Sequence, residues 1–269
     1  MDNFFQSIKI RKIILLYFLI TIITAGISEL PVLKKCAVLD FQFWLMITNA
    51  VLFICFIFKL KKSNIKINTF INDFRDKINY MEILKLIIVN IVLSLGFILC
   101  LCFIIHSINP QRVDKLLNED SAGDINSVYL FVVNFIGGTL LAPFVEEFIV
   151  RGVILNRLKI RWKVKTSILV SSFLFGIMHT DIAFLGAFVF GIFMSIIYLK
   201  TRNILINIFA HALNNFIISI TQIYFLFDTS SSSINNFNYN IMGSAGLILL
   251  LIAGIFAMKY INKNKKFCY

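Results

Sequence analysis

The sequence predicts an all-α fold: a multi-pass transmembrane helical bundle of about eight spans, with both termini in the cytoplasm. Three observations support this prediction, namely the composition, the length of the apolar stretches and the distribution of basic residues. Of the 269 residues, 59% are hydrophobic and only 15% are charged, whereas soluble domains carry about 25% charged residues. A soluble protein of this size would lack the polar residues needed to cover its surface. We therefore expect the chain to lie in a lipid bilayer.

Eight apolar stretches are candidates for crossing the bilayer. They cover residues 13–30, 39–58, 83–105, 128–150, 166–180, 182–199, 203–227 and 241–261. The first stretch follows a short basic segment, as a signal peptide does, but no small-x-small cleavage site follows it, so we expect a retained anchor. The stretches 166–180 and 182–199 are short for two full crossings. We therefore expect their connection, Thr180-Asp181, to turn inside the protein.

The basic residues alternate between the segments that join these stretches. Of the 26 Lys and Arg residues, 21 fall before residue 13, in 59–85, in 157–165, in 200–202 and in the C-terminal tail, whereas four fall in the intervening loops. The positive-inside rule places the richer segments in the cytoplasm. The net charge of +12 does not indicate nucleic-acid binding, because no basic patch with interleaved aromatic residues is present. Segment 59–82 fits either an amphipathic helix on the inner leaflet or a cytoplasmic loop.

We divide the chain into three regions. Residues 1–127 form an accessory N-terminal membrane region of three spans, residues 128–227 form the expected catalytic membrane core, and residues 228–269 form an outer loop, a final span and a basic cytoplasmic tail. The core is set apart by ionisable residues inside apolar stretches. Such residues are costly in a bilayer and usually face a functional cavity.

Two adjacent carboxylates, Glu146 and Glu147, lie inside the fourth stretch. Glu147 and Arg151 are four residues apart on one helix face, so we expect them to form a structural ion pair. Glu146 is rotated about 100° from its neighbour and is free to point elsewhere. Pro143 and the pair Gly137-Gly138 can bend this helix and free main-chain groups to line a cavity.

Three further polar residues, His179, His211 and Asn215, lie in later stretches at a depth similar to that of Glu146. His211 and Asn215 are four apart and share a helix face. We expect these four groups to meet in a cavity reached from the cytoplasmic side. Glu146, helped by His179, could deprotonate a water molecule, and His211 and Asn215 could donate hydrogen bonds to the oxyanion formed by attack on a peptide carbonyl.

The motifs Glu146-Glu147-x-x-x-Arg151, Phe175-x-x-x-His179 and His211-x-x-x-Asn215 resemble the three signature motifs of the CPBP intramembrane proteases. This family includes the CAAX prenyl endopeptidases and the bacterial bacteriocin-processing or Abi-type proteins. All three motifs are complete, in order and on separate stretches, and the resemblance covers about residues 128–220. It implies that Glu146 and His179 activate water, that His211 and Asn215 form the oxyanion site, and that Glu147 and Arg151 support the structure.

The resemblance leaves the metal requirement open, because the family has been described both as metalloproteases and as metal-independent glutamate proteases. The sequence contains no HExxH motif, and catalytic zinc usually has closely spaced ligands on one element. We therefore expect no obligatory metal. A zinc site formed by Glu146, His179 and His211 is the alternative.

The leading interpretation is an intramembrane endopeptidase in a bacterial plasma membrane, acting on a peptide or a membrane protein. The composition, rich in Ile, Lys and Asn, is typical of a low-GC bacterium, so a pheromone, a bacteriocin leader or a membrane protein is a more suitable substrate than a CAAX tail. Two alternatives are a non-catalytic scaffold or bacteriocin self-immunity protein and a proton-coupled transporter. The lack of an internal repeat argues against the transporter.

Overall fold

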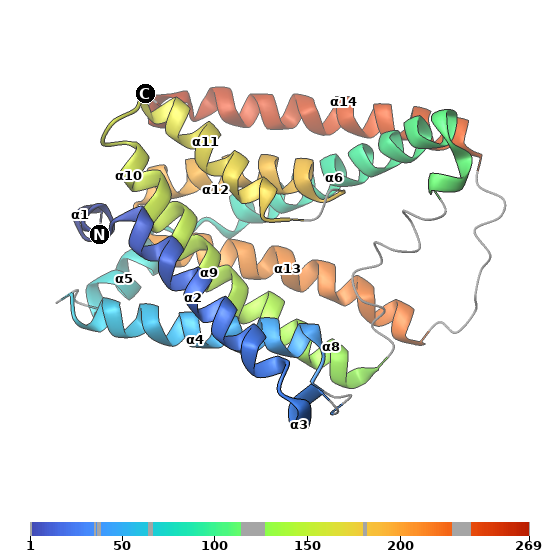
Figure 1. Cartoon of the computed structure of the whole chain (residues 1–269). Coiled ribbons are helices and arrows are strands. Elements are labelled where there is room, and N and C mark those ends of the chain that lie inside the picture. The colour runs from blue at the N-terminus through green and yellow to red at the C-terminus, as the bar shows by residue number, and fades with distance from the viewer. Residues whose placement is uncertain are drawn as a thin grey trace.

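The computed structural model describes residues 2–34, 36, 39–63, 67–113, 127–179, 182–227 and 238–268, and within these ranges every regular element is helical. Figure 1 shows the helices side by side in one bundle. The longer elements are α2 (Ile10–Ser28), α4 (Phe41–Lys61), α5 (Ile67–Lys77), α6 (Tyr80–Ile108), α11 (Val164–Ile177), α12 (Phe184–Thr201), α13 (Ile204–Phe227) and α14 (Tyr239–Lys263). Short helices are α1 (Asp2–Ser7), α3 (Pro31–Lys34) and the 3₁₀ turn η3 (Lys265–Phe267).

One further long helix runs from Val128 to Leu158 in five consecutive parts. These are α8 (Val128–Asn134), the π-helical segment η1 (Phe135–Leu141), α9 (Ala142–Glu147), the π-helical segment η2 (Phe148–Leu155) and α10 (Asn156–Leu158). We call this the composite helix. It contains both adjacent carboxylates.

In the described part of the chain, seven helices are long and apolar enough to cross a membrane. The multi-pass α-helical bundle expected from the sequence is thereby confirmed, with one difference in the number of full spans. The expected fifth span is α11, which has only 14 residues and is about 21 Å long, whereas the hydrocarbon core is about 30 Å thick. The connection Thr180-Asp181 lies outside the described residues.

The described parts of the segments expected in the cytoplasm gather at one end of the bundle (Figure 1), which we call the basic end (residues 2–12, 59–63, 67–85, 157–165, 200–203 and 259–268). Arg157 donates a hydrogen bond to the carbonyl of Gln6 at 2.7 Å. Lys200 pairs with Glu82 at 2.6 Å, and Tyr260 donates to the same carboxylate at 3.1 Å. Both termini lie at this end in Figure 1. The grouping of the basic segments thus agrees with the charge pattern, and their cytoplasmic location remains a prediction.

Segment 59–82 contains a helix, α5, which decides between the two structures considered for it. Its apolar side packs on α13, where the rings of Phe74 and Phe209 lie 6.1 Å apart in an edge-to-face arrangement. Asn203 donates a hydrogen bond to the carbonyl of Phe70 at 2.9 Å. Its charged residues are on the outside, among them Lys77 and Asp73, which pair at 2.8 Å. Residues 67–77 of this segment therefore form an amphipathic helix that packs on α13, and its location on the inner leaflet stays a prediction.

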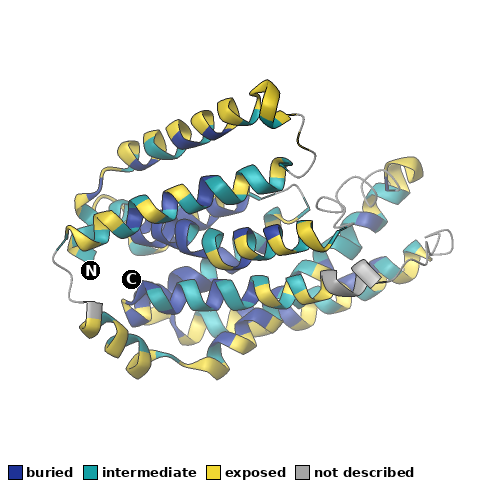
Figure 2. Ribbon diagram, turned by 90° about the horizontal axis from the view of Figure 1, so that it is seen from below, coloured by how far each residue is buried: buried dark blue, intermediate teal, exposed yellow. Residues whose placement is uncertain are grey.

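The core of the bundle surrounds the composite helix. Figure 2 shows exposed residues on the outer faces of the helices and buried residues gathered in the middle. Phe148 stacks on Phe56 of α4 at 4.2 Å and contacts Phe5 of α1 edge-on at 5.3 Å. Many large apolar side chains on the outer faces of α2 and α14 are at least half exposed, for example Leu15 and Leu251. Such a surface suits contact with lipid tails.

Helices α6 and α14 pack closely along small residues. A Cβ atom added to Gly246 would lie 2.8 Å from the sulfur of Cys100 and 3.0 Å from the carbonyl of Gly96. These distances are shorter than ordinary contacts, so the two main chains approach each other only because both glycines lack a side chain. Gly254, on the same helix α14, has nothing within 4 Å of its added Cβ.

We expect Gly246→Val to force α6 and α14 apart and to lower the free energy of unfolding by about 1–3 kcal/mol, the usual cost of overpacking. Gly254→Val is the matched control, because it introduces the same side chain into the same helix where space is open. The measurement is thermal unfolding of both variants in the same detergent. Equal melting temperatures for the two variants would contradict this packing.

Candidate active site

The composite helix departs from α-helical geometry next to Glu146. The amide of Ala142 bonds to the carbonyl of Gly137, five residues before it, and Pro143 has no N–H group to donate. The carbonyl of Gly138 accepts a hydrogen bond from the side-chain nitrogen of Asn215 on α13 at 2.8 Å. The helix is therefore irregular at the glycine pair and the proline, and a main-chain carbonyl there bonds to another helix. The sequence led us to expect such a freed main-chain group.

Glu147 and Arg151 form the expected ion pair in the centre of the bundle. Their side chains are fully buried, and Arg151 Nη1 lies 2.8 Å from Glu147 Oε1. Arg151 also donates to the carbonyl of Gly191 on α12 at 3.2 Å, and its guanidinium lies 4.4 Å from the centre of the Phe175 ring. The charges of a buried pair cost little only when further polar contacts satisfy them. Here the carbonyl of Gly191 and the ring of Phe175 provide such contacts from two other helices, while Arg151 Nε has no hydrogen-bond partner among the described residues.

Two residues of α13 complete the surroundings of the Glu147 carboxylate. His211 Nδ1 lies 3.0 Å from Glu147 Oε1, and Asn207 Nδ2 lies 3.4 Å from Oε2. An ionised carboxylate only accepts hydrogen bonds. It therefore places a proton on Nδ1 of His211, in the way that carboxylates orient catalytic imidazoles.

The other ring nitrogen of His211 faces Glu146. His211 Nε2 lies 3.8 Å from Glu146 Oε2, and this oxygen makes no hydrogen bond within the described part of the chain. Since Nδ1 is held by Glu147, Nε2 is the atom through which His211 can exchange a proton at the site. When His211 is neutral, Nε2 accepts a hydrogen bond, and when His211 is protonated, Nε2 donates one.

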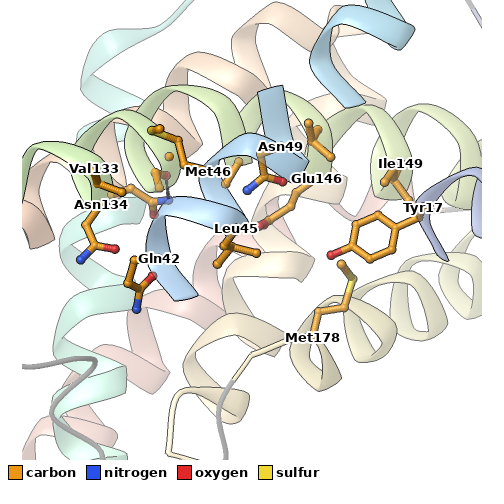
Figure 3. A pocket seen from close by; sticks show the side chains of 15 residues that line it. Tyr17, Gln42, Leu45, Met46, Asn49, Val133, Asn134, Glu146, Ile149 and Met178 are labelled. Carbon is orange, nitrogen blue, oxygen red and sulfur yellow. Dashed lines mark hydrogen bonds between the residues drawn. The ribbon is translucent and has the colours of Figure 1, made fainter. Parts of the chain in front are cut away.

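Glu146 and Asn215 line one cavity of about 290 Å³ (Figure 3). The composite helix contributes one wall through Gly137, Gly138 and Glu146, and α2 and α4 contribute the opposite wall. The NH₂ group of Asn215 has two hydrogens, of which one reaches the Gly138 carbonyl. The second hydrogen is left for another acceptor. The cavity therefore combines a carboxylate oxygen without a partner and a carboxamide donor.

His179 is not in direct contact with these groups. Its Nδ1 lies 2.8 Å from the carbonyl of Phe175, four residues before it on α11, so the proton on Nδ1 points into its own helix. The ring of Phe175 lies 4.6 Å from the His179 ring and 5.7 Å from the His211 ring. The structure thus brings Glu146, His211 and Asn215 together with Glu147 and Arg151, and the ring of Phe175 lies close to both His179 and His211.

The residues that line the cavity are spread along the bundle axis. Gln42 in the first turn of α4 and Asn134 at the end of α8 lie far from the basic end, since Gln42 and Lys59 are 17 residues apart on α4, or about 25 Å. Tyr17 of α2, which also lines the cavity, is only five residues from Lys12 of the basic end. The expected approach from the cytoplasmic side stays a prediction.

Among the described residues, no group of three or more His, Cys, Asp or Glu side chains is arranged to hold a metal ion. The zinc site considered for Glu146, His179 and His211 would need all three side chains to converge on one point. In the structure, His211 Nε2 lies 3.8 Å from Glu146 Oε2, and His179 Nδ1 is bound to the carbonyl of Phe175. The three side chains do not form a gathered donor set among the described residues, and the metal requirement stays a prediction.

Sequence reasoning missed two polar contributors to the site. Asn207 precedes His211 by four residues, as His211 precedes Asn215, so the spacing alone could have indicated it. Asn49, which lines the cavity from α4, had a weaker signal: it is a polar residue inside an apolar stretch. Nothing in its position along the chain pointed to Glu146.

We expect Arg151→Met to lower the free energy of unfolding by about 3–5 kcal/mol, because it leaves the buried Glu147 charge without its partner. Lys77→Met is the matched control. It removes another i,i+4 pair, with Asp73, whose side chains are more than 40% exposed, and such pairs contribute less than about 1 kcal/mol. Denaturant unfolding in micelles measures both. Comparable losses for the two variants would contradict the central role of the buried pair.

Comparisons with known proteins agree with the motifs. Residues 128–217 match the family model described as type II CAAX prenyl endopeptidase Rce1-like. A protein of Bacillus subtilis (strain 168), named "Putative membrane peptidase YdiL", is 27% identical over 107 residues, which are 39% of this chain and 44% of that protein. No solved structure matches. The resemblance is thus confirmed: the segment that contains all three motifs is similar to the CAAX-type membrane proteases of the CPBP family.

Proposed function

We propose that this multi-pass membrane protein is an intramembrane endopeptidase that hydrolyses a peptide bond with water activated at Glu146. The observation that carries the proposal is the position of Glu146, whose Oε2 has no hydrogen-bond partner among the described residues, lies 3.8 Å from His211 Nε2 and belongs to a side chain that lines a cavity. An unpaired carboxylate in such surroundings is costly. The similarity to CAAX-type proteases over residues 128–217 supports the same activity.

In the proposed reaction, Glu146 accepts a proton from a water molecule while the water oxygen attacks the carbonyl carbon of the substrate. The second hydrogen of the Asn215 carboxamide and the Nε2–H of protonated His211 stabilise the oxyanion that forms. Glu147 stabilises this imidazolium through Nδ1. The proton taken up by Glu146 then passes to the leaving amide nitrogen, and the carbon–nitrogen bond breaks to give a carboxylic acid and an amine. The acid then loses its proton to the amine or to water and becomes a carboxylate.

We assign His179 a part in orienting the attacking water. Its Nδ1 is bound to the Phe175 carbonyl, which leaves Nε2 as an acceptor for a water molecule. This assignment rests on the family motif and on Nε2, which makes no hydrogen bond with the described residues. In the proposed reaction, a water molecule bound to His179 Nε2 is the one that Glu146 deprotonates.

The proposed substrate is a peptide segment embedded in the membrane or a secreted peptide. The family model is named for prenyl endopeptidases and the relative for a membrane peptidase, and both names describe cleavage of peptide bonds at a membrane. We propose the bacterial plasma membrane as the location. Processing of a bacteriocin leader or a pheromone would suit a site of this kind, and a non-catalytic immunity protein is the alternative role.

We expect Glu146→Gln to abolish the activity, with a rate at least about 10²-fold lower, because general base catalysis contributes that much or more. The measurement is a quantitative peptide profile of membranes and medium from cells that express the native protein or the variant. Glu29→Gln is the matched control, since Glu29 is exposed and pairs with Lys34. Its profile should equal that of the native protein.

Identical profiles for the native protein and Glu146→Gln, with protection of the cells against a bacteriocin preserved, would rule out the catalytic function. They would support the immunity role instead. The substitution is nearly isosteric, so the fold is expected to persist, and a thermal unfolding curve of each variant checks this. Peptides that depend on Glu146 identify both the protease and its substrate.

We also propose that hydrolysis needs no metal ion, since Glu146, His179 and His211 do not converge on one point in the structure. Treatment of the purified protein with EDTA or 1,10-phenanthroline is expected to leave the cleavage rate unchanged. Elemental analysis of the same sample measures bound zinc. Loss of activity that added zinc restores would show that these residues do bind a catalytic metal.

A further inference from the structure

The wall of the cavity opposite Glu146 contains an amide side chain without a partner. Asn49 of α4 is only 8% exposed and makes no side-chain hydrogen bond within the described part of the chain, but its amide atoms are not among the fully enclosed polar atoms that lack a partner. Asn49 and Glu146 line the same cavity, and Figure 3 shows both side chains pointing into it. The adjacent Thr48 differs, because its hydroxyl lies 2.8 Å from that of Thr24 on α2.

A largely buried carboxamide that makes no hydrogen bond with the protein loses part of its hydration without a replacement, which reduces stability. Such a group is therefore suited to receive a ligand. A carboxamide both donates and accepts, which is the combination that a peptide main chain requires. Gln42 also lines the cavity and lies seven residues before Asn49, within about 20° of the same helix face.

A peptide bond that is to be cleaved must first leave helical structure, since its carbonyl has to be reached by water. At membrane depth, the N–H and C=O groups of an unwound segment have no water to bind, and each costs several kcal/mol. Side chains beside Glu146 that form hydrogen bonds with these N–H and C=O groups would stabilise the unwound segment. Asn49 and Gln42 are such groups, and they come from a helix outside the matched residues 128–217.

The cavity also offers space at this place. Gly138 lines it, and an added Cβ at Gly138 would meet nothing within 4 Å. The neighbouring Gly137 differs, because its added Cβ would lie 3.2 Å from Met46 of α4. The composite helix thus contacts α4 at Gly137 and leaves room beside Gly138, next to the carboxamide of Asn215.

We propose that Asn49 and Gln42, which lies about two helical turns earlier on α4, bind the main chain of an unwound substrate segment beside Glu146. This inference rests on the proposed endopeptidase function. It adds the class of substrate, which is a peptide segment in an unwound conformation. The site selects a segment by its exposed peptide groups, held between α4 and the Gly138 region. Helix α4 is therefore a substrate-binding element of the active site as well as part of the scaffold.

The test uses the full-length protein purified in detergent and a pool of random-sequence fluorogenic nonapeptides. Native protein, Asn49→Leu, Asn49→Gln, Thr48→Val and Glu146→Gln are compared on the fastest-cleaved peptide of the pool. For Asn49→Leu we expect KM to rise about threefold to tenfold, as for loss of one hydrogen bond, with a smaller change in kcat. Asn49→Gln keeps the carboxamide and should recover part of the loss, and Thr48→Val should leave KM unchanged.

Thermal unfolding of the same variants provides a measurement that does not depend on finding a substrate. Asn49→Leu is expected to melt at or above the temperature of the native protein, because it removes an unpaired buried amide, whereas Thr48→Val should melt lower. A melting temperature for Asn49→Leu as low as that of Thr48→Val, or an unchanged KM, would overturn the proposal. Failure of Glu146→Gln to reduce cleavage, or absence of cleavage by the native protein, would count against the endopeptidase function, and the unfolding curves would then decide on Asn49 alone.

Discussion

The arrangement of the site depends on one buried carboxylate, that of Glu147. It accepts hydrogen bonds from Arg151 on the same helix and from His211 and Asn207 on α13. Arg151 extends the network to α12 through the Gly191 carbonyl. A charge at this depth is tolerable only while all these donors are in place, so the positions of three helices are fixed together. His211 can then present Nε2 to Glu146, although Glu146 itself takes no part in the network.

The first helices of the chain contribute side chains to the site, in addition to their expected part in anchoring the protein in the membrane. Phe5 of α1 fills the space over Gly152, where an added Cβ would lie 2.6 Å from its ring, and it packs on Phe148 next to the carboxylate pair. Helix α4 lines the cavity from the other side. The expected division into an accessory region, residues 1–127, and a catalytic core, residues 128–227, stays a prediction, and residues of both parts line the cavity.

Local spacing could predict part of this site, and the rest depends on how helices are rotated about their axes. The Glu147–Arg151 pair was predictable because four residues bring two side chains together in any α-helix. The bond between Glu147 and His211 depends on the packing of two distant segments, and apolar periodicity does not encode which face of α13 turns inward. The position of Asn49 at the cavity could not be predicted for the same reason. The all-α membrane fold was predictable because composition and span length are set by the bilayer itself.

The short helix α11 has a consequence for the surrounding lipid. Its 14 residues extend about 21 Å, and a hydrophobic segment shorter than the bilayer is accommodated by local thinning of the membrane. Thinning brings the headgroup layer, with its hydration, closer to the end of α11, where His179 lies. The proposed hydrolysis consumes one water molecule for each bond cleaved. A depression in the bilayer beside α11 would give that water a shorter path through hydrocarbon.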